Sequence, residues 1–175
     1  MLKNFIQFSG IFVLIIVSSC KDDEPGLNKD ALIAQPWNLT ELKYTIAQGF
    51  TIDGFEQLEE CNKDNRFVFN DDGELQVLEH TLICQDSPGE ILATGTWSLK
   101  SSILNISSDY FSRLIEAMAQ SFPGNFEYDN NTFGFEVTQL TTSTLKLLYK
   151  EQYSDPSTGL TYDIDINLTF QAISN

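Results

Sequence analysis

The chain has 175 residues, with 25 acidic and 10 basic side chains and a formal net charge of −15 at pH 7. A field of this sign repels nucleic acid and anionic lipid headgroups, so we expect no nucleic-acid partner. The length is suited to a single domain with a sizeable hydrophobic core.

Residues 1–19 are typical of a signal peptide. Lys3 precedes an apolar run from Phe5 to Val17, which is too short to span a bilayer. The run ends in Val17-Ser18-Ser19-Cys20, which resembles the lipobox of bacterial lipoproteins. The resemblance implies cleavage before Cys20, lipid attachment to its thiol, and a membrane partner reached through acyl chains. The alternative is an ordinary secretory signal with an incidental cysteine.

Residues 20–30 predict an acylated cysteine followed by a flexible acidic tether. The tetrapeptide Lys21-Asp22-Asp23-Glu24 resembles the export signal of Bacteroidota lipoproteins. That resemblance implies an outer-membrane lipoprotein displayed on the cell surface. The alternative is a solvated charged linker.

Two cysteines remain after Cys20 is set aside, Cys61 and Cys84. An even pair in an exported chain predicts a disulfide, which would stabilise the fold by about 3 kcal/mol on the chain-entropy estimate. A free, reactive pair is the alternative. These cysteines and the single histidine, His80, form no tetrahedral ligand set with plausible spacing, so we expect no metal and no cofactor.

Residues 31–175 predict one all-β domain, because apolar and polar side chains alternate along most of it. We expect eight strands, at 37–46, 66–70, 74–82, 91–99, 103–107, 133–137, 145–153 and 160–171. Turn residues separate them, such as Asp71-Asp72-Gly73 between the second and third. Eight strands joined in this way predict an antiparallel up-and-down barrel, which leaves no exposed edges.

One segment breaks the alternation. Ser108 or Asp109 is suited to cap a helix, and four apolar residues follow at helical spacing: Phe111, Leu114, Ile115 and Met118. Phe122-Pro123-Gly124 would end it. A short amphipathic helix between two strands predicts a plug over one end of the barrel, and a ligand-gating lid is the alternative.

The strand motifs resemble the lipocalin-like domains of Bacteroidota lipoproteins over residues 31–172. The resemblance is carried by Trp37, Cys61, Arg66-Phe67-Val68-Phe69, Asp72-Gly73, Cys84, Gly95-Thr96-Trp97-Ser98-Leu99, Val137-Thr138-Gln139-Leu140-Thr141 and Leu145-Lys146-Leu147. It implies an eight-stranded lipocalin-like barrel, a fold that often binds small apolar ligands at its open mouth. Gln35-Pro36 stands where the family usually has a glycine two residues before the tryptophan.

Catalytic chemistry is not indicated. His80 follows Glu79 in a predicted strand, where neighbouring side chains point to opposite faces and cannot form a base and its orienting group. The chain has no nucleophile elbow and no glycine-rich phosphate loop after a strand. Oxygen-rich stretches at 70–74 and 129–131 lack the spacing of a helix–loop–helix calcium site and are better explained as turns. We expect a protein that is not an enzyme.

Aromatic residues are the remaining candidates for contacts with a ligand. Five are expected to point inward, to fill the core or to line a ligand cavity: Trp37, Trp97, Phe135, Tyr149 and Tyr162. Two functions follow. One is a membrane-anchored binding module for a small apolar or amphipathic ligand. The other is a solid barrel that serves as an accessory protein, with protein partners in a cell-envelope complex such as glycan uptake.

Overall fold

The computed structural model describes residues 27–46, 49–85, 87–119, 131–154 and 158–173. The strands are β1 (Trp37–Ile46), β2 (Phe50–Asp53), β3 (Arg66–Phe69), β4 (Glu74–Leu78), β5 (Ile91–Lys100), β6 (Ile103–Ser108), β7 (Thr132–Leu140), β8 (Thr144–Ser154) and β9 (Thr161–Ala172). The helices are α1 (Lys29–Ile33), α2 (Glu60–Lys63) and α3 (Asp109–Ala119). In the described part of the chain, none of these helices has the length and apolar character that a membrane span requires.

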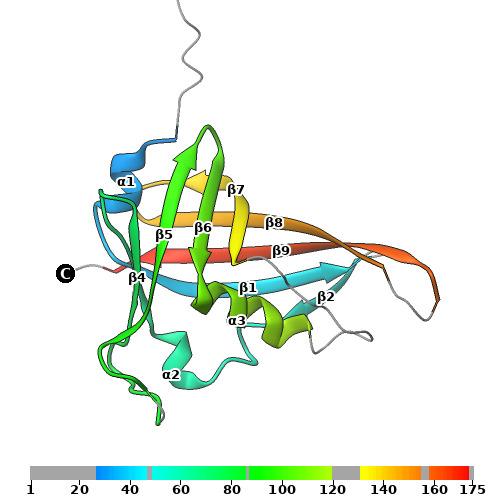
Figure 1. The fold of residues 1–175 in the computed structure, drawn as a ribbon, viewed down its shortest axis with the longest axis horizontal. Helices are drawn as coiled ribbons and strands as arrows, with labels where there is room; N and C mark the ends of the chain where they lie inside the picture. Colours follow the sequence, from blue (N-terminus) through cyan, green and yellow to red (C-terminus); the bar gives the residue numbers. More distant parts are fainter. Residues whose placement is uncertain (1–26, 47–48, 86, 120–130, 155–157, 174–175) are drawn as a thin grey trace, which may run out of the picture.

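Eight of the strands close into an antiparallel barrel (Figure 1). From β3 to β9 each strand pairs with the next, and β9 pairs with β1. The ring closes where β1 meets β3, through the pairs Trp37↔Phe67 and Asn38↔Arg66. β2 is an additional strand that forms a hairpin with the second part of β1, from Lys43 to Ile46. The predicted eight-stranded antiparallel barrel is therefore confirmed.

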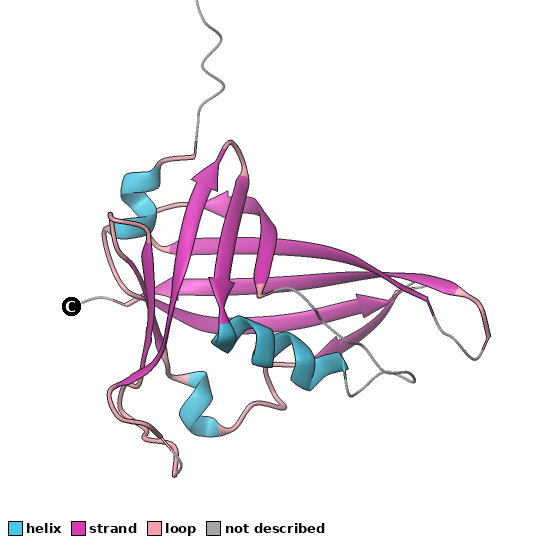
Figure 2. Cartoon of the chain, viewed as in Figure 1, coloured by secondary structure: helices cyan, strands magenta, loops and turns pink. Residues whose placement is uncertain are grey.

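The barrel has two different ends. At the end that we call the closed end lie α1 and the tight β3–β4, β5–β6 and β7–β8 turns (Figures 1 and 2). At the end that we call the mouth lie α2, α3 and the β4–β5 loop (Figures 1 and 2). The first described residues, which lead into α1, are thus at the closed end.

Contacts of α1 seal the closed end. The indole Nε1 of Trp37 donates a hydrogen bond to the carbonyl oxygen of Leu32 at 2.8 Å. Lys29 Nζ lies 2.6 Å from Asp71 Oδ1 in the β3–β4 turn and 5.4 Å from the ring centre of Trp97. Sequence periodicity did not predict α1, which begins within the range expected to be a tether, because a five-residue helix has too few residues to show a helical period.

Apolar side chains fill the barrel interior. Eleven of them have 0 % of their surface exposed: Trp37, Leu42, Phe67, Leu75, Val77, Leu104, Ile106, Phe111, Phe135, Leu145 and Phe170. A side chain with no exposed surface does not line a void large enough to hold a water molecule. At the level of these residues the barrel is packed and holds no ligand-sized space.

α3 contributes one of these core residues. The Phe111 ring packs edge-to-face against Phe67 and Phe135, with ring centres 5.8 Å away in each case. Tyr110 packs against Phe67 at 5.6 Å. The Ser108 hydroxyl accepts a hydrogen bond from the Tyr110 amide at 3.3 Å, as predicted for a capping residue. These contacts favour the plug over the lid; the predicted stop at 122–124 lies outside the described residues.

β4 is shorter than the sequence pattern predicts. It ends at Leu78, whereas alternation suggested a strand up to Leu82. The carboxylate of Asp64 explains the difference, because its Oδ2 accepts hydrogen bonds from the amides of Thr81 and Leu82, at 3.0 and 2.9 Å. The two amides therefore donate to the Asp64 carboxylate and not to a carbonyl group of a neighbouring strand. The strand ends before them for this reason.

Candidate ligand site at the barrel mouth

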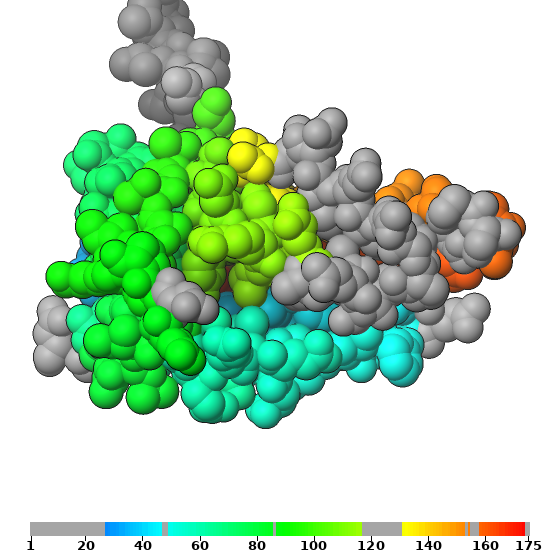
Figure 3. Space-filling view, turned by 60° about the horizontal axis from the view of Figure 1, so that its bottom comes forward, coloured from blue at the N-terminus to red at the C-terminus, as the bar shows by residue number. Residues whose placement is uncertain are grey.

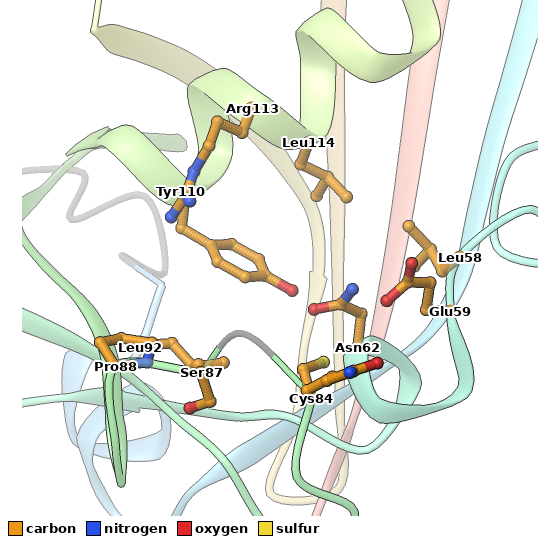
Figure 4. Close-up of a pocket in the computed structure, with 11 residues that line it drawn as sticks. Leu58, Glu59, Asn62, Cys84, Ser87, Pro88, Leu92, Tyr110, Arg113 and Leu114 are labelled. Atoms are coloured by element: carbon orange, nitrogen blue, oxygen red, sulfur yellow. The ribbon is translucent and has the colours of Figure 1, made fainter.

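A pocket of about 470 Å³ opens at the mouth, outside the packed interior. Its walls come from three segments that are far apart in the sequence: α2 with the residues before it, the β4–β5 loop, and the first turns of α3 (Figure 4). The lining residues are Leu58, Glu59, Asn62, Cys84, Gln85, Ser87, Pro88, Leu92, Tyr110, Arg113 and Leu114. The volume falls within the range of roughly 300–1,000 Å³ that is typical of small-molecule sites.

The disulfide joins two of the three walls. Cys61 of α2 is bonded to Cys84 of the β4–β5 loop, with a Cα–Cα distance of 5.3 Å, which confirms the predicted pair. The loop is held further by Glu79, whose Oε1 accepts a hydrogen bond from the Cys84 amide at 3.0 Å. The β4–β5 loop is therefore fixed against α2 although it has no regular secondary structure.

The polar part of the pocket is organised by Asn65, which is completely buried behind it. Asn65 Nδ2 donates to the Tyr110 hydroxyl at 3.0 Å and, more weakly, to Asn62 Oδ1 at 3.4 Å. Burial raises the pKa of Tyr110, and this effect exceeds the opposing influence of the Asn65 hydrogen bond and of the Arg113 charge. The Tyr110 side chain is therefore a neutral hydroxyl at physiological pH.

Leucines line the rest of the pocket. Leu114 projects from α3 into it, Leu58 lies on the α2 side, and Leu92 lies at the start of β5 (Figure 4). Leu58 and Leu92 keep part of their surface exposed and pack against the edge of the core. In the space-filling view, the surface is hollowed between α3 and α2 (Figure 3). The site thus combines apolar walls with a few oriented polar groups.

Neither metal chemistry nor a catalytic base is assembled among the described residues. Glu59 lies close to the sulfur atoms of Cys61 and Cys84, all within 4.8 Å of one another. A metal would need thiolates, which the disulfide removes. His80 is exposed, with its Nε2 2.9 Å from Arg66 Nη2, while the Glu79 carboxylate is buried against the Cys84 amide. The His80 ring thus contacts Arg66 and the Glu79 carboxylate a backbone amide, so the two do not form a base and its orienting group.

The five aromatic residues expected to point inward belong to the core or pack against it, and none of them lines the mouth pocket. Trp37, Trp97 and Phe135 are buried. Tyr149 and Tyr162 are partly buried, and the Tyr149 ring lies 5.7 Å from that of Phe135. The predicted lipidation residue Cys20 and export signal Lys21-Asp22-Asp23-Glu24 lie outside the described residues.

Sequence reasoning missed the polar residues that line the pocket, although it named Cys84 and Leu114 in other roles. Asn62 lies in a one-turn helix, and Tyr110 and Arg113 belong to a helix that was read only for its apolar positions. The available signal was the cysteine pair, because a bridge between Cys61 and Cys84 brings the α2 segment against the β4–β5 loop. The approach of α3 to both segments has no counterpart in local sequence patterns.

The chain was compared with known proteins in three ways. The model of the family described as "Lipocalin-like domain" matches residues 33–147. Among solved structures, a lipocalin-like protein from Bacteroides uniformis is similar, with 18% sequence identity and a TM-score of 0.44, over 81% of this chain and 98% of that chain. No curated protein matches the chain. Since the family model covers more than half of the sequence, the chain belongs to the lipocalin-like domain family.

Proposed function

We propose that this protein is a membrane-anchored, non-catalytic binding module that holds a small apolar or amphipathic ligand in the mouth pocket. The lipocalin-like barrel supports a binding role in general. The observation that carries the proposal is the pocket itself, a space of about 470 Å³ with leucine walls and oriented polar groups. Because the barrel interior is packed, we place the ligand at the mouth and not inside the barrel.

The anchor in this proposal is Cys20, acylated after cleavage of residues 1–19. The described chain enters the fold through α1, at the closed end of the barrel. The chain from the anchor would therefore join the fold at the end opposite the mouth. Replacement of Cys20 by Ala should abolish incorporation of labelled fatty acid into the protein, because the thiol that carries the lipid is absent. Alanines in place of Asp22-Asp23-Glu24 should abolish its accessibility to protease on whole cells; unchanged accessibility would rule out the export signal.

Ligand binding is tested on the chain that starts at Lys21, since every contact described above lies within residues 27–173. Titration with a neutral fluorescent acyl probe, the methyl ester of dansyl-undecanoate, should give saturable binding at micromolar concentrations. The variant Leu92→Trp fills the pocket and should abolish binding. Ile103→Trp, at an exposed position at the opposite end of the barrel, is the matched control and should bind normally. Absence of saturable binding, or equal binding by Leu92→Trp, would refute the proposal.

A second candidate is an accessory protein of an envelope complex. The observation in its favour is a pair of apolar side chains on the β4–β5 loop, Leu82 and Ile83, which are 46% and 73% exposed. The loop that presents them is held by the Cys61–Cys84 disulfide and by Asp64. A photo-crosslinker at position 83 should then yield one discrete adduct with an envelope protein in cells. The same crosslinker at position 103 should yield none, and equal adducts at both positions would count against this candidate.

A further inference from the structure

The buried Asn65 side chain orients the polar groups that face the pocket. Its Nδ2 atom carries two protons, one directed to the Tyr110 hydroxyl oxygen at 3.0 Å and the other to Asn62 Oδ1 at 3.4 Å. A tyrosine hydroxyl that accepts a hydrogen bond still has its own proton to donate. No described residue accepts a hydrogen bond from this hydroxyl.

Asn62 is oriented in the same way. Its amide oxygen is turned toward Asn65, so its Nδ2 group, which is donor only, is the part left for the pocket. The Asn62 and Tyr110 side chains both line the pocket, and the Tyr110 hydroxyl points toward Asn62 (Figure 4). The pocket therefore offers two hydrogen-bond donors, the Tyr110 hydroxyl and the Asn62 Nδ2 group, which suits a ligand with an acceptor oxygen.

The charges around the pocket decide what kind of acceptor fits. The charged residues that line it are Glu59 on the α2 side and Arg113 on α3, at opposite sides of the Tyr110 ring (Figure 4). Their formal charges cancel, while the whole protein carries a net charge of −15. A carboxylate head would gain nothing from this balanced pair and would be repelled by the net negative field, whereas an uncharged carbonyl would not.

We infer that the ligand is a neutral acyl compound, an ester or amide whose carbonyl oxygen accepts hydrogen bonds from the Tyr110 hydroxyl and the Asn62 amide. Its hydrocarbon chain lies along Leu58, Leu92 and Leu114. The inference rests on the proposed function, because it names the ligand class of the same pocket. A site of this kind differs from one that binds a fatty-acid anion through a cationic side chain.

The test is displacement of the bound methyl ester of dansyl-undecanoate from the chain that starts at Lys21, by methyl decanoate, decanoate and decylamine. These three compounds have similar chains and differ in the head: neutral acceptor, anionic acceptor and cationic donor. Methyl decanoate should displace the probe at the lowest concentration. Tyr110→Phe should weaken methyl decanoate about tenfold, as expected for the loss of one hydrogen bond inside a pocket.

Matched variants separate the head-group contact from general damage. Tyr149→Phe removes a hydroxyl outside the pocket and should leave the affinity unchanged. Asn62→Asp replaces the donor with an acceptor and should also weaken methyl decanoate, which keeps the test decisive if Tyr110→Phe does not fold. Arg113→Gln should change the affinity for methyl decanoate less than twofold.

Three results would overturn the inference in different ways. Tighter binding of decanoate, lost in Arg113→Gln, would assign the site to anions and leave the proposed function intact. Equal displacement by all three compounds, unaffected by Tyr110→Phe, would show that the pocket does not discriminate between head groups. The proposed function would again stand. Failure of the probe itself to bind would contradict both proposals.

Discussion

Replacing Phe111 with Ala tests whether α3 is a plug that belongs to the core or a lid that rests on the mouth. Phe111 is 0% exposed and packs against Phe67 and Phe135, with ring centres 5.8 Å away from each. Truncating a buried phenylalanine costs about 3–5 kcal/mol, including the cavity that it leaves. The edge-to-face contacts place this position in the upper part of that range, so we expect a loss of about 4 kcal/mol.

The assay is urea and thermal denaturation of the chain that starts at Lys21, monitored by circular dichroism. For a domain of this size, a loss of about 4 kcal/mol lowers Tm by roughly 8–16 °C. Glu116→Ala, on the exposed face of the same helix, is the control and should change the free energy of unfolding by less than about 0.5 kcal/mol. A loss below about 1 kcal/mol for Phe111→Ala would show that α3 opens independently of the barrel and would refute the plug.

Three further predictions concern other parts of the fold. Replacing Cys61 and Cys84 together by Ser should lower the free energy of unfolding by about 3 kcal/mol, measured in urea, and an unchanged value would contradict a stabilising role for the bridge. A Cβ atom at Gly95 would lie 2.3 Å from the Ser107 carbonyl oxygen, so Gly95→Ala should cost about 1–3 kcal/mol. Gly134→Ala, where the nearest such contact is 3.4 Å, should cost less, and equal thermal shifts would refute this reading. Because burial raises the pKa of Tyr110, its hydroxyl stays neutral in the folded protein while the unfolded chain ionises near pH ~10. This contribution to stability is complete below pH ~10 and falls as the pH rises above it, so urea midpoints from pH 8 to 11 should fall less steeply for Tyr110→Phe.

Alternation of side chains was sufficient to predict the barrel, because one face of each strand must be buried. β9 shows this most clearly, with Ile164, Ile166, Leu168 and Phe170 buried in turn. The helix after β6 was likewise visible from Phe111, Leu114 and Ile115, whose spacing matches one face of a helix. In both cases the spacing of apolar side chains along the sequence indicates which side chains are buried.

Short elements and the pocket could not be predicted in this way. α1, α2 and β2 contain four or five residues each, too few to establish a period. The end of β4 depends on Asp64, which lies ten residues before that strand begins. The pocket depends on the packing of three distant segments, of which the sequence indicated only one link, the Cys61–Cys84 pair.

The central claim is that ligand binds at the mouth and not inside the barrel. The most direct measurement is an amide ¹H–¹⁵N correlation spectrum of the chain that starts at Lys21, recorded during titration with methyl decanoate. We expect saturable shifts at Asn62, Leu92 and Leu114, and unchanged resonances at Leu104 and Ile106 in the packed interior. Shifts concentrated at Leu104 and Ile106, or no saturable shifts at all, would contradict the account.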